Sequence, residues 1–183
     1  MININNINEA VDILLEQKPL IIFQGKSEWG PRALGNRSIL FDPRNKDAKN
    51  IVNDFKKREW WRPLAGTILL EHVHDWFDIG TLKESPYMSF AVDAKQQSIE
   101  KTPSIVHIDN TCRIQTVTKE QNFHYYSLIF EFYKKTGVPM LLNTSFNLAG
   151  STIVETLKQA INVCEISEFK HLYVPDLPKG LKK

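Results

Sequence analysis

The chain has 183 residues, of which 42% are hydrophobic and 10% aromatic, and its formal net charge at pH 7 is +2. This composition is typical of a globular protein and argues against disorder. So small a charge leaves no strong electrostatic footprint for nucleic acid or an anionic membrane. No basic and apolar leader opens the chain, and no segment approaches the roughly 20 apolar residues of a membrane span.

Length and cysteine content bound the organisation of the chain. A chain of this size buries roughly 70% of its unfolded surface, which is enough for a substantial core. We therefore expect a single domain over residues 1–183. The two cysteines, Cys112 and Cys164, have neither metal-type spacing nor the number needed for a disulfide framework. A reducing, cytoplasmic setting is the simplest expectation.

Apolar spacing and turn residues predict the secondary structure in chain order. The chain opens with an N-terminal helix within about residues 1–20, capped by Asn6 or Asn8. Helices and strands then mix without strict alternation, so we predict an α/β (α+β) fold with one twisted, mixed sheet flanked by helices. We further predict a strand or turn over 38–45 and a turn that becomes a strand over 62–73. The other predictions are strands over 19–25, 87–95, 138–147 and 171–175, helices over 46–61, 122–137 and 156–167, and a basic tail over about 175–183.

Two of the predictions concern details. β-branched runs on either side of Asp109-Asn110-Thr111 predict a β-hairpin over residues 104–117. Helical spacing over residues 122–137 predicts Gly137 as the C-cap. In that helix the inward-facing residues are predicted to be Tyr126, Ile129, Phe130 and Tyr133.

The segment Gly25-Lys26-Ser27 follows an apolar strand and is similar to the end of a phosphate-binding P-loop. The full motif requires a glycine five positions earlier, where Leu20 stands, and a helix that begins at the Lys-Ser pair. Here the chain continues instead into Trp29-Gly30-Pro31, which is turn chemistry. The P-loop interpretation therefore fails, although Arg32 and Arg37 and several glycines still suit anion binding by another design.

Four polar clusters follow predicted strands or turns, which is where open sheets place their sites. Each has a structural alternative: basic side chains are mostly solvated, tandem tryptophans mostly pack, and Asn-Thr-Ser sequences form turns and helix caps. Together, however, arginine forks, glycines and neutral amide or hydroxyl donors favour a site that positions oxyanions and stabilises charge. We predict no metal site, because no acidic cluster is evident. The clusters are residues 25–38, 56–63, 107–117 and 143–147.

Five strings in order complete a family resemblance: GPRALGNRSILFDPR, KKREWWRP, SPYMSF, HIDNTCRIQTV and TGVPMLLNTSFN. From about residue 23 to about residue 174 the chain resembles the C-terminal domain of the carbamoyltransferase family of nodulation protein NodU and the antibiotic O-carbamoyltransferases. That domain is similar in fold to YrdC-type threonylcarbamoyl-adenylate synthases. The resemblance implies a YrdC-like twisted sheet, flanked by helices, around a positively charged cavity.

The resemblance also implies a reaction. Carbamoyl phosphate and ATP, with nucleotide-bound Mg²⁺, form carbamoyl-adenylate, and the carbamoyl group then moves to an acceptor hydroxyl. In this reaction Arg32 would grip phosphate, and Asn143 and Ser145 would hold the adenylate and carbamoyl oxygens. The residues carried over by motif are Lys56, Arg62 and Arg113 as catalytic groups, these three with Arg32, Asn143 and Ser145 as substrate- and nucleotide-binding groups, and Arg37, His107 and Asp109 as supporting groups.

One departure from the family pattern concerns length. Family members are much longer, and a large N-terminal domain carries the acceptor site. We therefore expect a stand-alone activating half that passes its product to a separate transferase subunit. Two alternatives stay open: a fragment of a longer carbamoyltransferase, and a non-catalytic nucleotide- or phosphate-binding regulatory module of a larger assembly. The arginines fall at loop ends rather than in a stripe, which disfavours a nucleic-acid partner.

Overall fold

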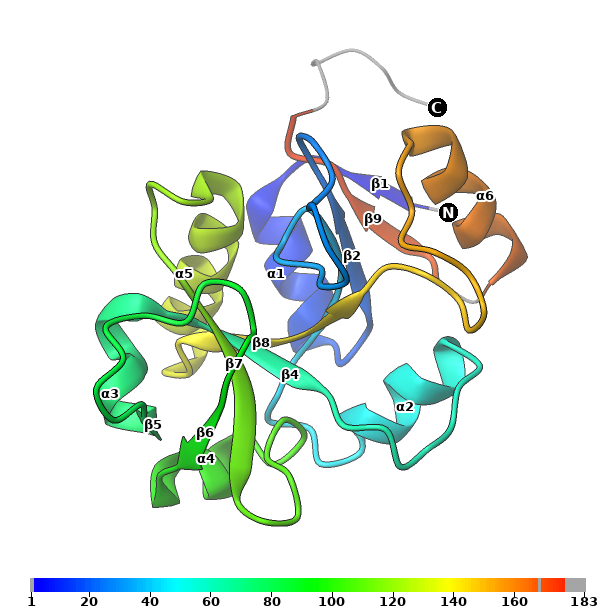
Figure 1. Cartoon of the computed structure of the whole chain (residues 1–183). Helices are drawn as coiled ribbons and strands as arrows, with labels where there is room; N and C mark the ends of the chain where they lie inside the picture. The colour runs from blue at the N-terminus through cyan, green and yellow to red at the C-terminus, as the bar shows by residue number, and fades with distance from the viewer. Residues whose placement is uncertain (1, 168, 177–183) are drawn as a thin grey trace.

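A computed structural model describes residues 2–167 and 169–176, in which nine strands form one sheet (Figure 1). The strand order is β1-β9-β2-β3-β8-β4-β7-β6-β5. The strands are β1 (Ile2–Ile4), β2 (Leu20–Phe23), β3 (Arg37–Phe41), β4 (Ala65–Leu69), β5 (Phe77–Asp78), β6 (Ala91–Ala94), β7 (Thr111–Val117), β8 (Met140–Ser145) and β9 (His171–Tyr173). The α-helices are α1 (Ile7–Leu15), α2 (Ala48–Phe55), α3 (Val73–Trp76), α4 (Gln96–Lys101), α5 (Phe123–Thr136) and α6 (Leu157–Ile166), with the 3₁₀-helix η1 at Leu70–His72.

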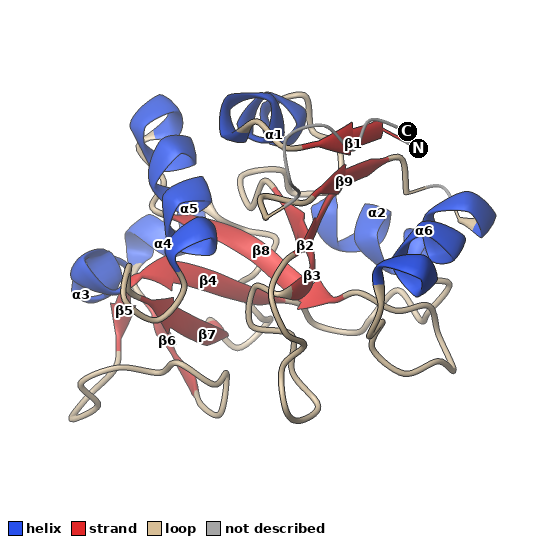
Figure 2. Cartoon of the chain, turned by 90° about the horizontal axis from the view of Figure 1, so that it is seen from above, coloured by secondary structure: helices blue, strands red, loops and turns tan. Residues whose placement is uncertain are grey.

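The sheet is mixed, as predicted. Strand β9 pairs in parallel with β1 and β2, and β4 pairs in parallel with β7. The central pairs β2–β3, β3–β8 and β4–β8 are antiparallel. Figure 2 shows α1 and α5 on one side of the sheet and long loops on the opposite side. No helix among the described residues is long and apolar enough to cross a membrane.

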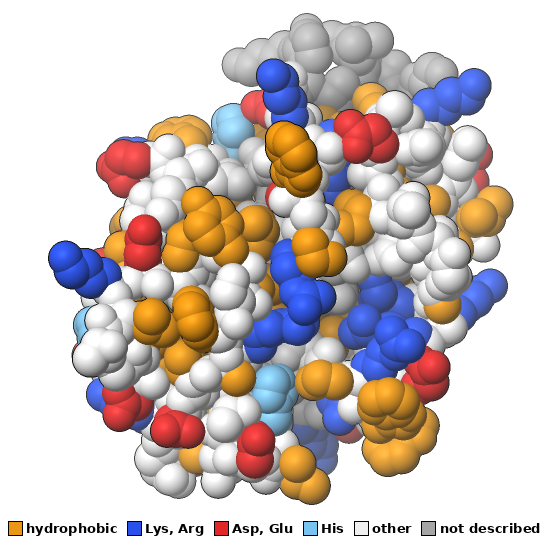
Figure 3. Space-filling view, in the orientation of Figure 1, with side chains coloured by type: hydrophobic (Ala, Val, Ile, Leu, Met, Phe, Trp, Pro, Cys, Tyr) orange, Lys and Arg blue, Asp and Glu red, His pale blue; other side chains and the backbone are white. Residues whose placement is uncertain are grey.

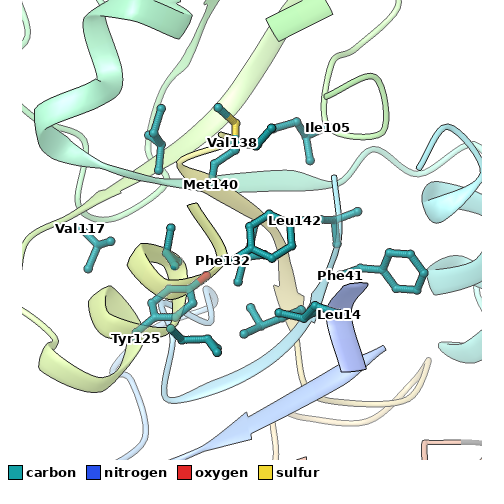
Figure 4. Close-up of a cluster of buried hydrophobic side chains, with 14 of the residues drawn as sticks. Leu14, Phe41, Ile105, Val117, Tyr125, Phe132, Val138, Met140 and Leu142 are labelled. Atoms are coloured by element: carbon teal, nitrogen blue, oxygen red, sulfur yellow. The ribbon is translucent and has the colours of Figure 1, made fainter. Parts of the chain in front are cut away.

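The core lies on both faces of the sheet, because successive residues of a strand point to opposite faces. In β2, Leu20 and Ile22 belong to the larger cluster under α1 and α5, which Figure 4 shows around Tyr125 and Phe132. Ile21 and Phe23 belong to the smaller cluster, which also contains Ala160 and Cys164 of α6. All four β2 residues are buried, so this strand reads in the sequence as a continuous apolar run.

The N-terminal helix lies within the predicted residues 1–20, from Ile7 to Leu15. Asn6 is its N-cap and accepts a hydrogen bond from the backbone N–H of Asn8 at 2.9 Å. A short strand that the sequence did not predict, β1, precedes it. At the other end of the chain, the predicted basic tail falls mostly outside the described residues.

The predicted hairpin over residues 104–117 is wrong. Only residues 111–117 form a strand, and residues 103–110 form turns. The backbone N–H of Asn110 donates to the His107 carbonyl, and Asn110 adopts a left-handed φ of 61°. The Asp-Asn pair therefore makes a turn, as its chemistry suggests. The partners of the following strand are β4 and β6 rather than the preceding run.

The inward face of α5 was also predicted wrongly in part. Gly137 is the left-handed C-cap, and Ile129 is buried, as predicted. The other buried residues are Tyr125, Leu128 and Phe132, whereas Phe130 remains 38% exposed. Because aromatic residues occupy adjacent positions in this helix, the sequence pattern fits either of two neighbouring faces as the buried one. The packing against β4 and β8 decides between them.

The predicted helix over residues 46–61 ends at Phe55, because Lys57 takes a left-handed φ of 53°. The residues after it leave the helix and form the loop that carries Arg58 and Arg62. This early end matters for the site described below.

Gly35 yields a stability prediction. Its φ is +108°, and a Cβ at this position would lie 2.1 Å from Cδ1 of the buried Tyr125. We expect Gly35→Ala to lower the free energy of unfolding by about 3 kcal/mol or more, from backbone strain plus overpacking. Gly80→Ala is the matched control, since Gly80 also has positive φ but nothing within 4 Å. It should cost about 1 kcal/mol. Equal losses in urea-induced unfolding would contradict this account.

Candidate oxyanion site

A half-buried glutamate, Glu28, organises the loop between β2 and β3. Glu28 Oε1 accepts hydrogen bonds from the backbone N–H groups of Leu34 at 2.6 Å and Asn36 at 2.7 Å. Gln24 Nε2 donates to the Gly35 carbonyl at 2.7 Å. These contacts fold the loop back on itself, which satisfies backbone groups that would otherwise lack partners. Arg32 lies in this loop and is exposed.

Arg37 holds the same loop in place by hydrogen bonds to backbone carbonyls. Its guanidinium donates to the backbone carbonyls of Gln24 at 2.6 Å, Gly25 at 3.1 Å and Glu155 at 3.0 Å, and it lies 3.7 Å over the ring of Phe23. Burial lowers the pKa of Arg37. Because backbone oxygens occupy its donors, Arg37 holds the loop and does not line the cavities described below.

Lys56 follows the early end of α2 and turns toward β8. Its side chain is only 2% exposed. Nζ donates to the backbone carbonyl of Ser145, to the Asn147 carbonyl at 3.0 Å and to Asn147 Oδ1 at 2.9 Å. Burial, reinforced by the charge of Arg58, lowers the pKa of Lys56 to about 7. The amine is thus poised to change charge near neutral pH.

Arg58 is held by Asn53, which is buried in α2. Arg58 Nε donates to Asn53 Oδ1 at 2.6 Å, and Asn53 Nδ2 donates to the backbone carbonyls of Trp60 and Arg62, each at 3.0 Å. One buried amide therefore fixes both the guanidinium and the loop after it. Burial, then the charges of Arg62 and Arg113, lower the pKa of Arg58 to about 10.

These side chains meet at two adjoining cavities on one face of the molecule, where Figure 3 shows Lys and Arg side chains gathered near the centre. The outer cavity measures about 700 Å³ and the inner pocket about 80 Å³. Arg32, Arg58 and Ser145 line both. The outer cavity is further lined by Lys56, Lys57, Glu59, Arg62, Asn147, Ala149, Gly150 and Ser151, and the inner pocket by Pro31, Ala33, Pro63, Leu64, Ala65, Met88, Arg113, Asn143 and Thr144.

A chain of buried side chains ties the inner pocket to the Glu28 loop. Asn143 Nδ2 lies within hydrogen-bond distance of Thr67 Oγ1 at 3.0 Å and Gln115 Oε1 at 3.2 Å, and Thr67 Oγ1 donates to Gln115 Oε1 at 2.9 Å. Asn143 Nδ2 also reaches the Ala33 carbonyl at 3.2 Å, and Gln115 Nε2 donates to the Leu34 carbonyl at 2.9 Å. Three central strands, β8, β4 and β7, thereby anchor the loop that carries Arg32.

The structure brings six of the sequence-predicted site residues together around the cavities: Arg32, Lys56, Arg62, Arg113, Asn143 and Ser145. His107 and Asp109 lie in the turn before β7 instead. Thr111 donates to Asp109 through its hydroxyl at 2.8 Å and its backbone N–H at 3.0 Å, which lowers the pKa of Asp109. His107 Nδ1 lies 3.1 Å from the Thr111 hydroxyl. Neither residue is among those that line the two cavities.

Sequence reasoning missed four residues of the site. Arg58 belongs to a basic run from which Lys56 and Arg62 were chosen, so only the packing of Asn53 singles it out. Asn147 fell in the last polar cluster without a role. Gln115 likewise fell in the third polar cluster without a role, and Thr67 lies within a predicted strand, where a polar residue becomes informative only when its buried partners are known.

The charge balance points to the kind of ligand. Burial and then Arg32 lower the pKa of Arg113, while Arg62 and Arg113 lower that of Arg58. These cations therefore repel one another. Glu59 is the one acidic residue that lines either cavity among the described residues, and it pairs with Arg62 at 2.7 Å on the exposed rim. Such an exposed pair contributes little. A bound oxyanion would relieve the repulsion, and guanidinium groups match its geometry.

The sequence profile of the carbamoyltransferase C-terminus family matches residues 11–178, and the chain belongs to this family. Nodulation protein NolNO of Sinorhizobium fredii is 42% identical over 155 residues, which make up 82% of this chain and 22% of that protein. The chain spans only 22% to 29% of the length of the first curated relatives that it matches. The predicted resemblance to this family is confirmed.

Two solved structures are similar in fold. Full-length HypF in its phosphate- and nucleotide-bound form gives a TM-score of 0.63 at 14% identity, covering 91% of this chain and 24% of that one. YciO from E. coli gives a TM-score of 0.57 at 15% identity, covering 95% and 81%. At these identities the likeness shows the fold alone. The predicted YrdC-like mixed α/β fold is confirmed.

Because the pKa of Lys56 is lowered to about 7, we predict that oxyanion binding at this site depends on pH. Without a ligand, the Lys56 ammonium loses its proton near pH 7. A bound oxyanion favours the ammonium form and raises the pKa of Lys56. Binding should therefore take up a proton. Affinity for sulfate, which does not titrate in this range, should fall by about tenfold per pH unit between pH 7 and 9. Isothermal titration calorimetry across this range measures the slope.

Two variants control for this experiment. Lys56→Met removes the titrating group and should flatten the slope while it weakens binding at pH 7. Lys158→Met replaces an exposed lysine of α6 and should leave the slope unchanged. An affinity that is independent of pH in the unmodified protein would show that Lys56 stays charged or does not reach the anion.

Proposed function

We propose that this chain is the carbamoyl-adenylate-forming component of a carbamoyltransferase, with carbamoyl phosphate and ATP as substrates. The observation that carries the proposal is the partition of the site. A large cavity lined by Arg32, Lys56, Arg58 and Arg62 suits a triphosphate. The adjoining pocket of about 80 Å³, reached by Arg113 and Asn143, suits a group of a few atoms such as carbamoyl.

In the proposed reaction, carbamoyl-adenylate forms in two steps. Water cleaves carbamoyl phosphate to carbamate and inorganic phosphate. A carbamate oxygen then attacks the α-phosphorus of ATP, forming the new O–P bond while the bond to pyrophosphate breaks. Both steps develop negative charge on phosphate oxygens, which preorganised cations stabilise. Arg113 and Arg58 are placed to stabilise charge at the inner pocket, and Lys56 and Arg62 to hold the nucleotide phosphates in the outer cavity.

Magnesium fits this scheme as part of the nucleotide. Within the described residues, no three His, Cys, Asp or Glu side chains gather into a metal-binding group. The cationic lining suits the phosphates rather than a metal ion, so we propose that the phosphates hold the magnesium. The ion would screen phosphate charge when bound. Full-length HypF, of which this chain covers 24%, was solved in a phosphate- and nucleotide-bound form, and this supports a nucleotide as the proposed ligand.

Transfer to the acceptor hydroxyl requires a further part. The chain spans about a quarter of the length of its relatives, so we propose that a separate transferase subunit or domain receives the carbamoyl-adenylate. The second candidate is a regulatory module that binds nucleotide or phosphate without turnover. The intact basic lining of the cavities is compatible with it, since phosphates bind there whether or not a reaction follows.

A product assay separates the two candidates. The protein is incubated with carbamoyl phosphate, ATP and magnesium, pyrophosphate release is measured, and carbamoyl-adenylate is sought by mass spectrometry. We expect product from the unmodified protein and about 10²- to 10³-fold less from Arg113→Ala, because an oriented donor to developing charge is lost. Lys158→Ala, on the exposed face of α6, serves as the control and should keep full activity.

ATP that binds with an affinity sensitive to Arg58→Ala, but yields neither pyrophosphate nor carbamoyl-adenylate even when a transferase partner is added, would favour the regulatory module over the enzyme.

A further inference from the structure

The inner pocket is bordered by residues with unsatisfied polar atoms. Arg58 Nη2, Arg113 Nε and Asn143 Oδ1 are each buried without a hydrogen-bond partner within the described part of the chain. All three residues line the inner pocket of about 80 Å³. A buried polar atom without a partner is costly, and the three residues that carry these atoms border one small pocket, which indicates a ligand that satisfies them. Two of the atoms belong to donor groups and one is an acceptor.

The hydrogen-bond network fixes which atom of Asn143 remains free. The Ala33 carbonyl can only accept, so the atom of Asn143 at 3.2 Å from it must be Nδ2. The same reasoning orients Gln115, whose Nε2 donates to the Leu34 carbonyl and whose Oε1 therefore faces Thr67 and Asn143. Both N–H groups of Asn143 are thus directed at protein acceptors. Asn143, only 1% exposed, can offer a ligand an acceptor but no donor.

We infer that Asn143 reads the amino group of the carbamoyl moiety rather than its oxygen, and that this contact makes the site selective for carbamoyl over acyl substrates. The inference rests on the proposed function. A carbamoyl group presents an oxygen that accepts from the two guanidinium groups and an N–H that donates to Asn143 Oδ1. An acetyl group offers the same oxygen but a methyl in place of the amine, which leaves Asn143 Oδ1 buried and unsatisfied.

Hydrogen bonding must make this distinction, because size does not. An amino group and a methyl group have nearly the same volume, so a pocket of about 80 Å³ admits both. Ala33, Leu64 and Met88 provide apolar walls that tolerate either group. Sites built around a buried polar atom reject analogues that lack its partner far more strongly than apolar pockets reject a change of one methylene.

A matched pair of stable ligands tests the inference. Phosphonoacetamide and acetonylphosphonate differ only in carrying NH₂ or CH₃ on the same carbonyl. Isothermal titration calorimetry with the full chain should give at least about tenfold tighter binding of phosphonoacetamide. In Asn143→Leu, an apolar replacement of similar size, the preference should fall to about threefold or less. The two affinities measured with the unmodified protein test the inference even if this variant does not fold.

Each other outcome has a definite meaning. Equal binding of the two ligands by the unmodified protein overturns the inference, and so does a preference that survives in folded Asn143→Leu. If that occurs while carbamoyl-adenylate still forms, the proposed function stands and only the role of Asn143 is wrong. If phosphonoacetamide is preferred but no adenylate forms, the inference is supported and the regulatory module replaces the enzyme.

Discussion

Neutral oxygens, rather than carboxylates, hold the two partly or fully buried cations of the site, Lys56 and Arg58, and the positive charge of the cavities depends on this arrangement. The backbone carbonyls of Ser145 and Asn147 accept hydrogen bonds from the Lys56 ammonium, and the side-chain amide oxygen of Asn53 accepts one from Arg58. Elsewhere the same chain uses a carboxylate for this purpose: Arg44 forks onto the buried Asp42 at 2.6 and 2.9 Å. A neutral acceptor orients a cation without cancelling its charge. The positive potential therefore stays available for a ligand.

The fold supplies those oxygens at the right place because α2 ends early and β8 ends beside it. Lys57 takes a left-handed conformation, so Lys56 caps the helix and its side chain reaches the end of β8. Along β8, Asn143 and Ser145 are two residues apart and thus point to the same face of the sheet. One side chain closes the inner pocket and the other lines both cavities. A single strand thereby sets the spacing between the two cavities.

The sequence predicted the mixed sheet and six of the residues at the cavities, since ordered motifs carry residue identity well. It did not predict their environments. Arg37 and Arg58 each belong to a basic polar cluster of the sequence, yet the first donates to backbone carbonyls and, within the described residues, the second has a buried nitrogen without a partner. The difference arises from contacts between segments distant in the chain, such as Arg37 with Glu155. Local pattern also failed at residues 104–110, because β7 pairs with β4 and with β6 across the intervening α4, and not with the run directly before it.

The amide network links stability to recognition. Thr67, Gln115 and Asn143 hold the loop that carries Arg32. In the same network the N–H groups of Asn143 donate to protein acceptors, while its Oδ1 has no partner within the described residues. Loop anchoring and the proposed ligand selection are therefore properties of one hydrogen-bonded unit. A change at Thr67 would alter the orientation of Asn143 without touching the ligand, because partly satisfied buried networks rearrange as a whole. Specificity in such a site depends on residues of the sheet interior as much as on those at its surface.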